Sequence, residues 1–211
     1  MRGFRLLARG LTVGLAVVGA FHLFTMTRVD DAGSVPAGER FVQTRFGAED
    51  APVTLRVFNR YSCGFCAEFA STIYSLLVRY PQHLDVEVLN LPVRDAGSHW
   101  TFALGAECAA QQGAFERYHR AAFSDPRVAY YSAGWRSMIE RVDIPDPADF
   151  ERCVEHEEQA HEVMAHREVA TKLGLRGTPG WEIGAVRGQG VPAFPLIDSL
   201  VADRIRSFSA R

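Results

Sequence analysis

The chain has 211 residues, of which 47% are hydrophobic, and a formal net charge of -2. This length supplies enough apolar side chains for a well-buried core and is typical of one or two domains. The near-neutral charge excludes nucleic acid as the main partner, because phosphate binding requires a concentrated basic surface.

The first residues form an apolar segment with a basic flank. Three arginines precede a run from Gly10 to Thr27 that contains no Asp, Glu, Lys or Arg. This pattern is typical of an export signal, and Val18-Gly19-Ala20 offers the small residues of a cleavage site. An uncleaved membrane anchor is the main alternative, although the run is slightly short for a span, and a buried helix is a third, less favoured one. We expect residues 1–28 to be a signal peptide or membrane anchor, which places the rest of the chain outside the cytoplasm.

A linker and a first strand follow. Residues 29–43 are polar and rich in Gly, Ala and Asp, as linkers are, with a lead-in strand or loop around Phe41 to Arg45. Val53 to Asn59 is a short run of apolar and β-branched residues, which predicts a buried strand.

A helix and a second strand come next. Apolar residues at helical spacing predict a helix that starts near Cys63 and runs to about Arg79, where Pro81 ends it. Leu84 to Pro92 alternates apolar and polar residues, which predicts a strand.

The second half of the chain begins with a long helical block, from Ser98 to Leu173. Within it, Asp146-Pro147 has the chemistry of an N-cap and a first helical residue. Gly177 to Gly190 predicts two short strands joined by a hairpin turn, and Phe194 to Phe208 predicts a final amphipathic helix. The order of elements predicts a mixed α/β fold with a helical insertion at about residues 97–173.

Cys63 and Cys66 form a CxxC motif at the start of the first predicted helix. Residues three apart on a helix lie nearly above one another, so the two sulfurs can bond. The first cysteine faces unpaired N–H groups and the positive end of the helix dipole, and both favour a thiolate. Arg60 adds positive potential, whereas Phe65 supplies no imidazole donor. We therefore expect a redox-active pair with an exposed, reactive Cys63.

Two other uses of the CxxC are less favoured. A structural zinc site requires four ligands, but there is no second CxxC, and His156, His161 and His166 do not share one helix face. A purely structural staple across three residues would save little chain entropy. We expect thiol-disulfide exchange without a metal or cofactor, and we expect most of the seven histidines to be solvated or to cap helices.

The chain has four cysteines, and outside the cytoplasm an even number favours disulfides. The closeness of Cys63 to Cys66 favours the pairing that leaves Cys108 with Cys153. The alternative for the second pair is two buried free thiols, which pack as small hydrophobic side chains.

The combination of a strand, a CxxC at a helix start, a helical insertion and Gly-Thr-Pro before a strand resembles the DsbA-like proteins of the thioredoxin superfamily. The resemblance extends from about Thr44 to Phe208 and lies in the segments APVTLRVFNRYSCGFCAEF, SHWTFALGAECAAQQGAFERYHRAAF and FERCVEHEEQAHEVMAHREVATKLGLRGTPGWEI. It implies that residues 44–211 adopt a thioredoxin fold with an inserted helical domain.

The resemblance also implies a function, that of an extracytoplasmic thiol-disulfide oxidoreductase. In this family pattern Cys63 and Cys66 are catalytic, and Thr178 and Pro179 form a substrate-binding loop with a cis peptide bond. Implied partners are cysteine-containing exported proteins and a membrane redox partner that resets the CxxC, with the protein acting as a monomer. A disulfide oxidase is favoured; a periplasmic thiol reductase and a non-catalytic peptide-binding module are the alternatives.

The chain departs from its relatives around the CxxC. Gly64-Phe65 replaces the Pro-His of the best-known oxidase, and Asn59 and Arg60 stand where relatives often have an acidic residue. Gly180-Trp181 follows the Thr-Pro where relatives often have an aromatic pair. These differences leave the redox potential and the substrate preference open. The resemblance supports a structural disulfide between Cys108 and Cys153.

Overall fold

The computed structural model describes residues 26–28, 44–92, 97–131 and 134–210. The predicted signal peptide or anchor lies outside the described residues except for its last three positions, and the predicted linker lies outside them entirely. No helix in the described ranges is both long and apolar enough to cross a membrane.

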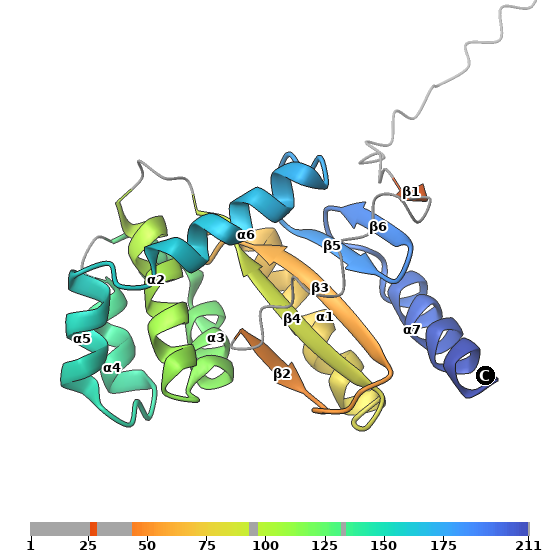
Figure 1. Cartoon of the computed structure of the whole chain (residues 1–211), viewed down its shortest axis with the longest axis horizontal. Helices are drawn as coiled ribbons and strands as arrows, with labels where there is room; N and C mark the ends of the chain where they lie inside the picture. Colours follow the sequence, from red (N-terminus) through yellow and green to blue (C-terminus); the bar gives the residue numbers. More distant parts are fainter. Residues whose placement is uncertain (1–25, 29–43, 93–96, 132–133, 211) are drawn as a thin grey trace, which may run out of the picture.

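A six-stranded mixed sheet lies at the centre of the fold (Figure 1). Its strands are β1 (Met26–Arg28), β2 (Arg45–Gly47), β3 (Val53–Asn59), β4 (Leu84–Asn90), β5 (Gly180–Ile183) and β6 (Val186–Gln189). They are ordered β1-β6-β5-β3-β4-β2. Only β3 and β4 pair in parallel, while the other neighbours in the described sheet are antiparallel.

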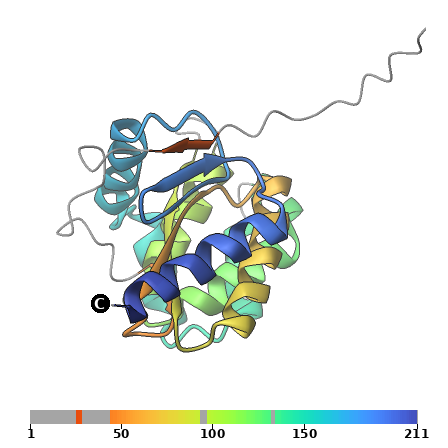
Figure 2. The same ribbon diagram turned by 90° about the vertical axis from the view of Figure 1, so that its right-hand side faces the viewer.

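The helices fall into two groups: those inserted between β4 and β5, and α1 and α7. They are α1 (Gly64–Arg79), α2 (Ser98–Gln111), α3 (Phe115–Ser124), α4 (Ser137–Arg141), α5 (Pro147–Glu155), α6 (Ala160–Lys172) and α7 (Phe194–Ser209), with short 3₁₀ helices η2 (Pro126–Tyr130) and η3 (Gly134–Arg136). Helices α2 to α6 form the insertion between β4 and β5 (Figure 1), and α7 runs beside α1 in the side view (Figure 2). The predicted α/β fold with a helical insertion is confirmed.

The apolar face of the sheet packs against α1 and α7. Leu55 and Val57 of β3 share one buried core with Ile73 of α1 and Ile197 of α7. Alternate side chains of a strand point to opposite faces, so the residues between these apolar ones lie on the other face of the sheet.

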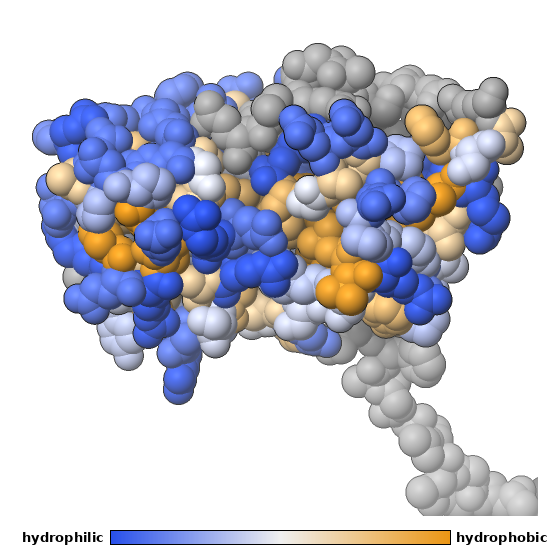
Figure 3. Space-filling model, turned by 90° about the horizontal axis from the view of Figure 1, so that it is seen from below, coloured by the Kyte–Doolittle hydropathy of each residue, from blue (hydrophilic) through white to orange (hydrophobic). Residues whose placement is uncertain are grey.

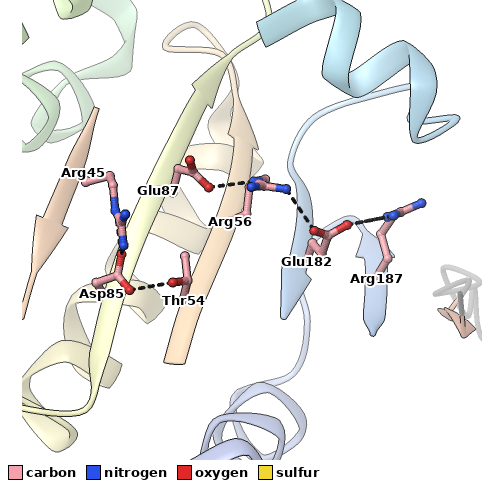
Figure 4. Close-up of polar contacts among 7 residues, drawn as sticks. All are labelled: Arg45, Thr54, Arg56, Asp85, Glu87, Glu182 and Arg187. Atoms are coloured by element: carbon pink, nitrogen blue, oxygen red, sulfur yellow. Dashed lines mark hydrogen bonds and ion pairs between the residues drawn. The ribbon is translucent and has the colours of Figure 1, made fainter. Parts of the chain in front are cut away.

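That other face carries a row of charged side chains across five strands (Figure 4). The Arg56 Nε lies 2.7 Å from the Glu87 Oε2, and the Arg56 Nη1 lies 3.1 Å from the Glu182 Oε1. Arg187 pairs with the same Glu182 at 2.7 Å. The row continues to Arg45, Thr54 and Asp85, which are joined by an ion pair and a hydrogen bond. Since buried ions are costly without partners, this pairing is what allows charged residues to occupy the face.

The local predictions hold at most element boundaries. The strand from Val53 to Asn59 and the end of the first helix at Arg79 are as predicted. Asp146 caps α5 by accepting a hydrogen bond from the Asp149 amide. The predicted lead-in strand or loop lies mostly outside the described residues, and the described strand there, β2, begins at Arg45 and pairs with β4.

Two histidines are exceptions to the prediction that most are solvated or cap helices. His119 is 2% exposed and His166 is fully buried. Burial lowers the pKa of each to about 3, so both imidazoles are neutral and pack as aromatic rings. The His166 Nδ1 accepts a hydrogen bond from the Asn90 amide, and the Asn90 side chain donates to the buried Glu107 carboxyl at 2.9 Å. Desolvation raises the pKa of Glu107 to about 8.

The outer surface is largely polar. On the face seen in Figure 3, hydrophilic side chains cover most of the side formed by the helical insertion, and hydrophobic ones appear between them in small groups. The large exposed hydrophobic residues of the described chain are Phe65, Val78, Tyr130, Tyr131, Phe194 and Phe208. Phe65 belongs to the CxxC motif, so one of these exposed rings stands at the predicted site.

Candidate functional site

The CxxC motif lies at the junction between β3 and α1. Cys63 is the N-cap residue of α1, with extended backbone angles, and Cys66 lies in the first turn. The Cys63 amide donates to the Arg60 carbonyl at 3.0 Å, and the Cys66 amide donates to the Cys63 carbonyl at 3.0 Å. Placing Cys63 at the helix start gives it the environment that lowers a thiol pKa.

Cys63 is less exposed than predicted. Only 7% of its surface is accessible, against 3% for Cys66, and both are free thiols in the structure. The Cys63 sulfur lies 3.6 Å from the Thr178 carbonyl oxygen, so the loop before β5 covers part of it. The sequence could not show this covering, because Thr178 is 115 positions away along the chain.

The two sulfurs have opposite acidities. The pKa of Cys63 is lowered to about 5, chiefly by the hydrogen bond from the Cys66 side chain. Hydrogen bonds from the Thr178 side chain and the Cys66 amide and the charge of Arg60 act in the same direction, against the opposing effect of burial. Burial and the hydrogen bond to Cys63 raise the pKa of Cys66 well above its ordinary value. At neutral pH the reduced site therefore holds one thiolate, on Cys63, and one thiol, on Cys66.

The two residues before Cys63 are fixed to the helical insertion. The buried Tyr61 hydroxyl lies 3.2 Å from the His119 Nδ1 of α3, and the two groups share a hydrogen bond. The Tyr61 ring also meets the Tyr118 ring edge-on at 5.8 Å. The Tyr130 hydroxyl of η2 donates to the Ser62 carbonyl at 2.6 Å. The insertion thus holds the backbone that carries the reactive sulfur.

Sequence reasoning missed these supporting residues. The available signal was the aromatic Tyr61 two positions before the CxxC and the Tyr118-His119 pair in the segment already noted for its resemblance. Nothing in a linear sequence indicates that these aromatic side chains meet, since Tyr61 and His119 are 58 positions apart.

Thr178 and Pro179 lie beside the CxxC, as the predicted arrangement requires. The peptide bond between them is cis. The Pro179 carbonyl accepts a hydrogen bond from the Gly190 amide at 2.8 Å, which ties the loop to the end of β6. The Thr178 carbonyl faces the Cys63 sulfur. The structure therefore brings all four predicted site residues together.

The second cysteine pair is bonded. Cys108 of α2 and Cys153 of α5 form a disulfide with an S–S distance of 2.01 Å, and both are 1% exposed. This disulfide joins two helices of the insertion and lies apart from the CxxC in the sequence. In the described parts of the chain, no three His, Cys, Asp or Glu side chains are grouped so that they could hold a metal ion.

Comparisons with known proteins agree with this architecture. The family model described as thioredoxin matches residues 41–189. A thioredoxin-like oxidoreductase from Silicibacter pomeroyi has a similar structure, with a TM-score of 0.68 and 22% identity over 77% of this chain and 91% of that one. The thiol-disulfide exchange protein alpha-DsbA2 from Wolbachia pipientis gives a TM-score of 0.67 and 19% identity, over 77% and 87%.

A third similar structure is a periplasmic thioredoxin-like protein from Salmonella enterica serovar Typhimurium, with a TM-score of 0.63 and 20% identity over 77% of this chain and 89% of that one. A search of curated proteins finds no significant match. At these identities the structural likeness establishes the fold, while the family match spans most of the chain. The chain therefore belongs to the thioredoxin family, with a fold similar to that of the DsbA-like thiol-disulfide oxidoreductases.

Proposed function

We propose that this protein is an extracytoplasmic thiol-disulfide oxidoreductase that donates its Cys63–Cys66 disulfide to cysteine pairs of exported proteins. The observation that carries the proposal is the pKa of Cys63, lowered to about 5 at a helix start beside the Thr178-Pro179 loop. A thiolate at neutral pH is both a good nucleophile and a good leaving group in disulfide exchange.

The exchange proceeds in two steps. A substrate thiolate attacks the Cys63 sulfur, the Cys63–Cys66 bond breaks, and Cys66 leaves and takes up a proton. A second substrate thiolate then attacks the substrate sulfur of the mixed disulfide, and Cys63 leaves as its stable thiolate. Two electrons pass from the substrate dithiol to the protein, and a membrane electron acceptor removes them to restore the disulfide.

Thr178 and Pro179 supply the surface on which the substrate is aligned. Backbone groups of this loop pair with an extended substrate peptide as an added strand, which places the substrate sulfur beside Cys63. The distance of 3.6 Å between the Cys63 sulfur and the Thr178 carbonyl supports this placement. The protein acts as a monomer, with Tyr61 and His119 as positioning residues behind the site.

The acidity of Cys63 favours oxidation over reduction of substrates. With an unfolded thiol pKa of about 8.5, a folded value near 5 stabilises the reduced protein by about 2.7 kcal/mol at pH 7, which solvent screening at a partly open site lowers to about 2 kcal/mol. For a two-electron couple this makes the pair about 40 to 60 mV more oxidising. A thiol reductase is the alternative, in which the same pair transfers electrons to its partners.

The reduction potential of the Cys63–Cys66 pair separates these two directions. Equilibration with glutathione buffers is expected to give a potential well above the value of about -270 mV typical of reducing thioredoxins, and a value near that figure would support the reductase. Replacing Cys63 by Ser should abolish oxidation of a reduced two-cysteine peptide, and persistent oxidation would remove the catalytic assignment. Fusion of residues 1–28 to a reporter that is active only after export tests the proposed location.

A further inference from the structure

A pocket lined by three arginines adjoins the proposed exchange site. It has a volume of about 510 Å³ and lies between the ends of β3 and β4, the second half of α6 and the loop that leads to Pro179. Arg60, Arg167 and Arg176 line it together with Thr178, whose carbonyl faces the reactive sulfur. Apart from these groups the lining is mainly aliphatic and small, with Leu91 and Ala170 among its residues.

In the described part of the chain, no carboxylate neutralises the positive charge of this pocket. No Asp or Glu of the described chain lines the pocket, and none of its three guanidinium groups forms a salt bridge with another described residue. By contrast, Arg56 and Arg187 on the nearby sheet face are each paired with a carboxylate. Arg60 and Arg167 are therefore exceptional among the half-buried arginines near the site, and Arg176 adds an exposed charge at the pocket.

Two of the unpaired nitrogens are buried. The Arg60 Nε and the Arg167 Nη1 are screened from solvent and have no hydrogen-bond partner among the described residues. A buried donor left unsatisfied costs free energy, and a donor that carries charge costs more. If these arginines were ordinary surface residues, their nitrogens would be hydrated. Their burial therefore favours a ligand in the pocket that accepts hydrogen bonds.

We propose that this pocket binds a carboxylate of the substrate, so that the protein prefers cysteines that lie within acidic peptide segments. Guanidinium groups bind carboxylates through two parallel hydrogen bonds. A peptide paired with the Thr178-Pro179 loop passes the pocket within a few residues, because an extended chain advances about 3.3 Å per residue. This inference rests on the proposed function and adds the class of substrate.

Two matched peptides test the preference. Each peptide has two cysteines. In the first peptide one of them has Glu on both sides, and in the second peptide the same cysteine has Gln on both sides. The measurement is the second-order rate constant for peptide oxidation by the disulfide form of the full chain at low ionic strength, normalised to each peptide's reaction with a small symmetrical disulfide. We expect the Glu peptide to react faster by about tenfold, which corresponds to about 1.4 kcal/mol.

Variants assign the preference to the pocket. Arg167→Gln with Arg176→Gln should reduce the ratio of the two rates to within about twofold, whereas Arg167→Lys should retain part of it, because charge remains and the two-pronged contact is lost. Arg206→Gln on α7, whose side chain is 69% exposed, removes the same charge away from the pocket and should leave the ratio unchanged. Since Arg176 is exposed, Arg176→Gln alone provides a variant whose folding is not at risk.

The possible results separate the two proposals. Equal rates for the two peptides in the unaltered protein, or a preference that survives the double substitution, would overturn the acidic pocket while thiol-disulfide exchange stands. If neither peptide is oxidised and dithiothreitol does not reduce the Cys63–Cys66 disulfide, the proposed function fails and the substrate preference fails with it. A tenfold preference that disappears in the double variant supports both.

Discussion

The acidity of Cys63 depends on a single neighbouring side chain that can be removed. The Cys66 thiol donates the hydrogen bond that contributes most to lowering the pKa of Cys63 to about 5. A hydrogen bond to a charged group contributes about 1.5 to 3 kcal/mol, and a thiol is a weak donor, so the lower end of that range applies. At about 1.4 kcal/mol per pH unit, replacing Cys66 by Ala should raise the pKa of Cys63 by about 1.

The absorbance of the thiolate near 240 nm measures this change directly. In the reduced protein only Cys63 ionises near neutral pH, because the pKa of Cys66 is raised and Cys108 and Cys153 are bonded to each other. Cys66→Ser is the matched control, since its hydroxyl can still donate and should keep the Cys63 titration close to that of the unaltered protein. An unchanged titration in Cys66→Ala would refute the argument and leave the helix start and Arg60 as the causes.

Three further predictions concern stability. Arg56→Met should lower the free energy of unfolding by about 3 kcal/mol in urea, because it removes the guanidinium that pairs with the buried Glu87 carboxylate. Replacing an exposed arginine of α7 should change it by less than about 0.5 kcal/mol, and an equally small loss in Arg56→Met would show that the row contributes little. Cys153→Ala opens a loop of 45 positions and should cost about 4 kcal/mol in the chain-entropy model, and a loss below about 1 kcal/mol would contradict that model here. For the oxidised protein, stability should be greatest near pH 6 to 7. Below this range stability falls, because His119 and His166 bind protons in the unfolded chain but stay neutral in the folded one, where their pKa values are lowered to about 3. Above this range stability also falls, because Glu107 is ionised in the unfolded chain but stays protonated in the folded one, where its pKa is raised to about 8. A pH-independent free energy of unfolding would contradict both assignments.

The chemistry-bearing residues could be predicted because their signals are local. A CxxC after an apolar β-branched run places Cys63 at a helix start, and this depends only on spacing and helix geometry. The Asp146 cap and the stop at Gly174, where φ is 68°, follow from side-chain chemistry and backbone sterics in the same way. The place of Thr178-Pro179 came from resemblance, because a proline alone does not fix its isomer.

What lies around the reactive sulfur could not be predicted in this way. The limited exposure of Cys63 depends on a loop that is 115 positions away, and the anchoring of Tyr61 depends on a histidine 58 positions away. His119 and His166 are polar by type, and nothing in the sequence set them apart from the other histidines, most of which were expected to be solvated or capping, yet tertiary packing buries them as neutral rings. Side-chain type gives only an average tendency toward water, and packing overrides it.

The sequence by itself determined the order of the elements and the position of the Cys63–Cys66 pair at a helix start, because periodicity, capping and spacing act over a few residues. Only the tertiary structure decided the contribution of burial and of Thr178 to the pKa of Cys63, the covering of its sulfur and the grouping of Arg60, Arg167 and Arg176. A pKa and a pocket depend on charges and burial contributed by segments distant in the chain, and those distances are set when the sheet and the insertion pack together.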